Sequence, residues 1–97
     1  MKMIAIKYFT NMPVEKLKGL NEGDRIELLT YKKDRKVSIL KYGDHLYRVE
    51  EDGFEKKTFD EIGEAQLPKL LKQLQRIEFP RSNIFFMNII PAVREGY

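Results

Sequence analysis

The longest uncharged apolar stretch of the chain is Asn83 to Ile90, near the C-terminal end. It reads Asn-Ile-Phe-Phe-Met-Asn-Ile-Ile and lies between Pro80 and Pro91. A segment of this length is too short to cross a membrane, and its β-branched and aromatic residues favour strand over helix. We therefore predict a central β-strand over residues 83–90, buried on both faces, with a neighbouring strand on each side.

Alternating apolar and polar residues predict the other strands. Residues 3–9 form a strand pattern suited to a place beside residues 83–90, and residues 25–59 predict a four-stranded antiparallel meander. Its last hairpin turns at Asp52-Gly53, and a two-residue turn there would place Glu51 opposite Phe54. The register of the hairpin at residues 32–35 stays open, because either two or three central residues fit the turn.

A helix is predicted over residues 67–78, with one or two helical turns also expected after Pro13 and ending at Gly19. Pro68 suits the first turn of the longer helix, and Pro80 follows its end. Its apolar residues recur at helical spacing: Leu67, Leu70, Leu71, Leu74 and Ile77. The fold class expected is α+β, a five- to six-stranded and mostly antiparallel sheet with helix 67–78 packed on one face.

A second fold stays open. The segment from Leu20 to Ile26, Leu-Asn-Glu-Gly-Asp-Arg-Ile, followed by a tight meander, resembles the start of small SH3-like or OB-like barrels. That resemblance implies a sheet that is partly closed. With 97 residues the chain has room for one hydrophobic core, so residues 1–97 are expected to form a single domain with a loose tail at residues 91–97.

The composition argues against an enzyme and against a metal or cofactor. There is no cysteine and one histidine, His45, and neither phosphate-binding glycine motif occurs. The acidic run from Glu50 to Glu55 lacks the order of a calcium loop, so we expect its carboxylates to lie in water at a hairpin tip. A chain without a long apolar segment or a signal-peptide profile is expected to be cytoplasmic, without a membrane partner.

In composition, the chain resembles small proteins of unassigned function from hyperthermophilic archaea. Lysine and glutamate are abundant, cysteine is absent and histidine is scarce. The resemblance implies no activity, ligand or site residue.

The distribution of charge along the chain suggests a function. Residues 24–48 hold 7 Lys and Arg against 4 Asp and Glu, whereas residues 49–63 hold 2 against 6. Cations and tyrosines that lie on neighbouring hairpins can contact phosphates and stack bases, so we predict a nucleic-acid-binding surface. Its candidate residues are Tyr31, Lys32, Lys33, Arg35, Lys36, Lys41, Tyr42 and Arg48. The alternative is a protein-interaction or homo-oligomeric module whose sheet is covered by a second copy.

Overall fold

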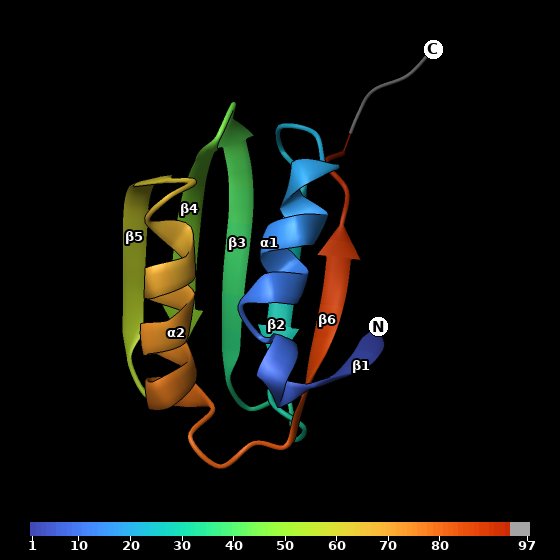
Figure 1. Cartoon of the computed structure of the whole chain (residues 1–97), viewed down its shortest axis with the longest axis vertical. Helices are drawn as coiled ribbons and strands as arrows, with labels where there is room; N and C mark the ends of the chain where they lie inside the picture. Colours follow the sequence, from blue (N-terminus) through green and yellow to red (C-terminus); the bar gives the residue numbers. More distant parts are fainter. Residues whose placement is uncertain (94–97) are drawn as a thin grey trace.

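The computed structural model describes residues 1–93, which form one antiparallel sheet with helices on one side (Figure 1). The elements, in chain order, are β1 (Lys2–Ala5), the 3-10 helix η1 (Ile6–Tyr8), α1 (Asn11–Lys18), β2 (Arg25–Leu29), β3 (Lys36–Gly43), β4 (Leu46–Asp52), β5 (Lys56–Gly63), α2 (Leu67–Glu78) and β6 (Ile84–Ile90).

The six strands lie in the order β1-β6-β2-β3-β4-β5, and every neighbouring pair is antiparallel. This order confirms the α+β class, the meander β2–β5 and the central position of β6, which has β1 on one side and β2 on the other. Because β1 and β5 lie at opposite edges, the sheet is open, and the expectation of a partly closed barrel is wrong.

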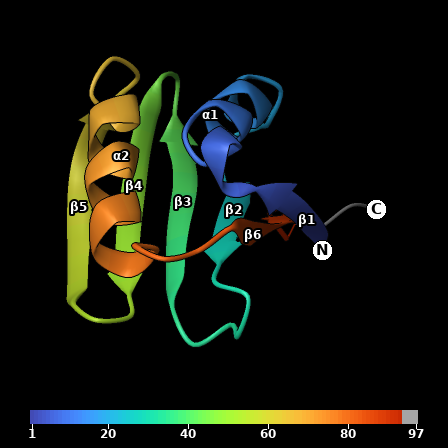
Figure 2. The same cartoon turned by 60° about the horizontal axis from the view of Figure 1, so that its bottom comes forward.

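Both α-helices cover the same face of the sheet, α2 over β4 and β5 and α1 over β2 (Figures 1 and 2). The core lies between the helices and the sheet, and its buried apolar residues are Ile4, Phe9, Leu17, Ile26, Leu28, Val37, Ile39, Tyr47, Val49, Leu67, Leu71, Leu74, Phe79, Phe85 and Met87. The Phe9 ring centroid lies 4.6 Å from that of Phe79 and 5.2 Å from that of Phe85, which links the two helical regions to β6. The expectation of one packed helix is therefore incomplete, because α1 contributes Leu17 to the same core.

The other face of the sheet is open, and no element within residues 1–93 covers it (Figure 2). On β6 this face carries Phe86 and Asn88, which are half-buried, and Ile90, which is exposed, whereas Phe85 and Met87 point into the core. The prediction that this strand is buried on both faces is therefore wrong. Apolar residues on the open face made the run look uniformly buried.

Two strand boundaries also differ from the prediction. The first strand ends at Ala5, because the chain turns into η1 before it reaches Phe9. In the β4–β5 hairpin, Asp52 pairs with Lys56 and Glu51 pairs with Lys57, so the loop has three residues rather than two. The reason is that the backbone N–H groups of Phe54 and Glu55 donate to the Glu78 carboxylate instead of closing a tight turn.

Candidate nucleic-acid interface

The β2–β3 loop, residues 30–35, follows directly from β2 and is braced by its own side chains. The Thr30 hydroxyl donates to Asp34 Oδ1 at 2.6 Å, and Lys33, at φ 60°, donates its N–H to the Thr30 carbonyl at 2.9 Å. The hydrogen bond from Thr30 lowers the pKa of Asp34, so this carboxylate stays ionised. The internal bonds give the loop a defined shape that directs its exposed side chains outward.

Tyr31 and Phe86 form a stacked aromatic pair at the end of the open face. Their ring centroids lie 6.1 Å apart with an interplanar angle of 25°, and Lys33 Nζ lies 4.9 Å from the Phe86 centroid. Tyr31 is 68% exposed although it contacts Phe86, so most of its ring surface meets solvent. We call Tyr31, Lys32, Lys33 and Phe86 the Tyr31 cluster.

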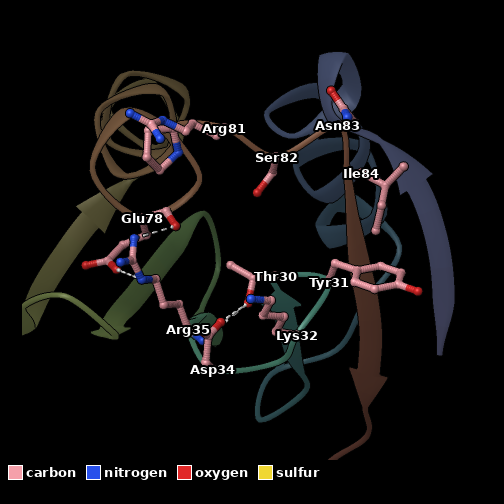
Figure 3. Close-up of a pocket in the computed structure, with 11 residues that line it drawn as sticks. Thr30, Tyr31, Lys32, Asp34, Arg35, Glu78, Arg81, Ser82, Asn83 and Ile84 are labelled. Carbon is pink, nitrogen blue, oxygen red and sulfur yellow. Dashed lines mark hydrogen bonds and ion pairs between the residues drawn. The ribbon is translucent and has the colours of Figure 1, made fainter.

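A cleft of about 750 Å³ adjoins this cluster, between the β2–β3 loop and the connection from α2 to β6 (Figure 3). Its lining residues are Thr30, Tyr31, Lys32, Asp34, Arg35, Glu78, Pro80, Arg81, Ser82, Asn83 and Ile84. The Ser82 hydroxyl points into the space between the two loops (Figure 3). Since three basic residues and two acidic residues line it, the cleft is mixed in charge rather than strongly basic.

Arg35 forms one wall of the cleft and is held in place by α2. One guanidinium N–H donates to the Glu78 carbonyl at 3.3 Å, and Nε lies 3.9 Å from Glu78 Oε1. The guanidinium carbon lies 5.8 Å from the Phe54 ring centroid. Arg35 therefore joins the loop to α2 and to the β4–β5 hairpin, so less of its charge is available to a ligand.

Three of the remaining candidates lie along the open face or its far end. Lys36 Nζ lies 3.2 Å from Glu27 Oε2, and Arg48 donates from Nε to Asp60 Oδ1 at 2.6 Å. The hydrogen bond and the charge of Asp60 raise the pKa of Arg48. The Arg48 guanidinium carbon lies 5.5 Å from the Tyr42 ring centroid, and the Tyr42 hydroxyl accepts the Glu61 N–H at 3.1 Å. Lys36 and Arg48 are therefore each already paired with a carboxylate.

Lys41 belongs to the opposite, helix-covered side of the sheet. Its Nζ donates to the carbonyls of Leu17 and Leu20, each at 3.0 Å, at the C-terminal end of α1. We call Lys41, Tyr42 and Arg48 the Tyr42 group. Of the eight predicted residues, the structure brings Tyr31, Lys32 and Lys33 together in one exposed loop and gives the other five partners elsewhere.

Sequence reasoning missed Phe86 and two glutamates. Phe86 alternates with the buried Phe85, which would have placed it on the outer face. Glu51 alternates in phase with the buried Tyr47 and Val49, and Glu78 follows Leu74 by one helical turn, yet both carboxylates were passed over. The expectation that Glu51 lies in water is wrong, since only 3% of this residue is exposed.

The described part of the chain shows no His, Asp and Glu group of three or more that could hold a metal ion. None of the helices in residues 1–93 is long and apolar enough to cross a membrane. Comparisons with protein-family models, curated proteins and solved structures give no match for this chain.

Proposed function

We propose that this protein binds single-stranded nucleic acid through the Tyr31 cluster. The observation that carries the proposal is the exposed Tyr31 ring, which is stacked on Phe86 with Lys33 beside it. An exposed ring of this kind offers a surface on which an unpaired base can stack, and stacking is worth about 1–3 kcal/mol per base. Bases in a duplex are already stacked, so a single strand fits this surface better.

Lys32 and Lys33 supply the positive charge for the phosphates. Both are exposed and lie next to Tyr31 in the chain, so a nucleotide stacked on the ring would place its backbone within their reach. Asp34 stays ionised in the same loop and offsets part of this charge. We therefore expect a modest affinity, on the order of 10⁻⁵ M, typical of binding that does not depend on sequence.

Fluorescence anisotropy with a labelled single-stranded oligonucleotide, at a series of salt concentrations, tests the proposal. Two phosphate contacts on a single strand predict a slope of log K against log salt of about −1.4. The double variant Lys32→Gln/Lys33→Gln should bind more weakly and lose most of that slope. The control Lys69→Gln/Lys72→Gln removes the same charge from the exposed side of α2 and should bind as the natural protein does.

Two results would contradict this function. One is the absence of binding at low salt, and the other is binding whose affinity does not change with salt. Equal losses in the two double variants would show that the net charge, and not this loop, attracts the ligand.

A second candidate function, self-association, is favoured by the apolar residues near the edge strand. Met3 is 56% exposed and Ile90 38%, and both lie at the β1–β6 end of the sheet. The β1–β6 register ends at Lys2 and Met87, so β1 does not pair with the last three residues of β6. Exposed edges and apolar side chains of this kind are common where a second chain binds.

Sedimentation over a hundredfold range of protein concentration distinguishes the two functions. Self-association predicts a mass that rises with concentration, and Met3→Glu should lower it. A monomer over the whole range would remove this candidate and leave the nucleic-acid proposal untouched.

A further inference from the structure

Two glutamates face each other beneath the sheet, where the β4–β5 hairpin meets the end of α2. Glu51 is 3% exposed and Glu78 is 1% exposed, and their carboxyl groups lie within hydrogen-bonding reach of each other. Two ionised carboxylates this close and this far from water would repel strongly. The pair therefore needs a proton.

The contacts of the two groups differ, and the difference places the proton on Glu51. Glu78 accepts hydrogen bonds from the N–H groups of Phe54 and Glu55 at 2.7 and 3.1 Å and lies beside Arg35, all of which favour the ionised form. Neither Glu51 oxygen has a partner of its own that can donate to it. A proton on Glu51 lets its hydroxyl donate to Glu78, which gives one of the two unpartnered Glu51 oxygens a partner and removes the repulsion between two charges.

The hairpin tip is built against this pair. A Cβ on Gly53 would overlap Glu78 Oε1 and would come within 2.9 Å of Arg35 Cβ, so only glycine permits the approach. The β4–β5 hairpin, the end of α2 and Arg35 consequently meet at the carboxyl groups of Glu51 and Glu78. A change in the charge of these two carboxyl groups therefore affects the contacts of all three.

We propose that Glu51 and Glu78 form a proton-sharing latch that fastens the β4–β5 hairpin and Arg35 to the end of α2, and that the latch weakens when Glu51 loses its proton. The inference does not depend on nucleic-acid binding, although Arg35 and Glu78 also line the cleft.

The charged groups around the latch set the direction of its response. Glu78 from α2 and Glu55 from the hairpin loop disfavour a negative charge on Glu51, whereas Lys57 from β5 favours it. Val37, the cross-strand partner of Glu51 on β3, carries no charge. Burial, the hydrogen bond to Glu78 and the negative charges of Glu78 and Glu55 outweigh Lys57 and raise the pKa of Glu51 to about 7. Burial alone would raise the pKa of Glu78, but the hydrogen bonds that it accepts outweigh burial and lower it.

A group that binds its proton more tightly in the folded state stabilises the fold at low pH and loses that effect as pH rises. For Glu51 the loss falls between 4.5, its ordinary pKa, and about 7. Glu78 acts oppositely and favours folding above its own lowered pKa. Together, they predict that the latch is strongest just below pH 5 and weak above pH 7.

Urea unfolding followed by circular dichroism at a series of pH values tests the latch. The test variant is Glu51→Gln, whose amide can donate to Glu78 at every pH. Between pH 4.5 and pH 7.5 we expect the unfolding equilibrium constant of the natural chain to rise on the order of 10²-fold more than that of Glu51→Gln. Glu50→Gln, one residue away on the open face, should keep the natural slope.

Equal pH slopes for Glu51→Gln and the natural chain would overturn the latch. If Glu51→Gln does not fold, carboxyl ¹³C NMR of the natural chain decides instead. One glutamate that titrates near pH 7 and changes together with Glu78 supports the latch, whereas glutamates that all titrate near 4.5 refute it.

Discussion

Tyr31 and Tyr42 both lie next to lysine in the chain, yet their surroundings in the fold differ. Around Tyr31, Lys33 lies over the Phe86 ring and Lys32 is exposed. Around Tyr42, Lys41 binds two carbonyls of the α1 region and Arg48 binds Asp60. Two segments of similar composition thus differ in whether their charged side chains are already paired within the protein: those beside Tyr42 are, and those of Lys32 and Lys33 beside Tyr31 have no carboxylate or carbonyl partner within the described residues 1–93.

The difference comes from what surrounds each segment. The β2–β3 loop lies at the end of the sheet, where Tyr31, Lys32 and Lys33 are exposed, while β3 and β4 bring the Tyr42 group beside α1 and β5. A cation near carbonyls or a carboxylate is bound within the protein, and a cation without them remains available to a ligand. A basic and aromatic segment is therefore a binding surface only where the fold leaves its charges unpaired.

Of the three substitutions, Lys41→Met should change the stability of the protein most. It removes two charge-assisted hydrogen bonds from the half-buried end of α1, so the free energy of unfolding should fall by about 2 kcal/mol. Urea unfolding measures this change, and Lys56→Met on the exposed edge strand is the control. The affinity for oligonucleotide, measured below the unfolding transition, should stay the same. A loss of affinity with unchanged stability would show that the segment around Tyr42 binds nucleic acid as the segment around Tyr31 is proposed to do.

Tyr31→Ala should act in the opposite way. Loss of one stacking surface predicts a five- to hundredfold weaker affinity for single-stranded oligonucleotide, roughly the equivalent of 1–3 kcal/mol. Stability should change little, because most of the ring is exposed. Tyr31→Phe keeps the ring and serves as the control in the same anisotropy titration. A natural affinity for Tyr31→Ala would move the binding site away from this ring.

Arg48→Gln should have the smallest effect on both measurements. Arg48 and Asp60 form a pair open to solvent, and such pairs add little to stability because water and salt screen them. We expect a nearly unchanged urea midpoint and an unchanged oligonucleotide affinity. A clear loss of affinity would show that the open face takes part in binding, and the site would then extend across the sheet from Tyr31.

Hydrophobic periodicity was sufficient to predict most of the fold. The meander and helix 67–78 followed from alternation and helical spacing, because the covered face of the sheet requires apolar residues at those positions. The central place of β6 was predicted correctly from its unbroken apolar run, although the burial on both faces from which it was inferred is wrong. The open face could not be recognised in the same way, since Phe86 and Ile90 are apolar without being in the core. Apolar character alone therefore does not show whether a residue lies in the core.

The candidate site was predicted less well, because its chemistry depends on contacts between distant segments. Alternation with Val37 and Ile39 would have placed Lys41 on the helix-covered face, but nothing local identifies Leu17 and Leu20 as its acceptors. The partnership of Glu51 with Glu78 joins residues on a strand and a helix in the same way. Each required the packing of α1 or α2 against the sheet to be known first.

The place of β6 in the sheet has a consequence for the order in which this chain folds during synthesis. β1 pairs with β6 and with no other strand of residues 1–93, so β1 stays unpaired until β6, which follows about 80 residues later in the chain, has been synthesised. The nascent chain can assemble β2 to β5 and α2 while the inner edge of β2 is still without its partner. We expect nascent chains in which β6 has not yet been synthesised to leave that edge and the apolar N-terminal segment exposed, and to depend on chaperones until β6 pairs with β2 and β1.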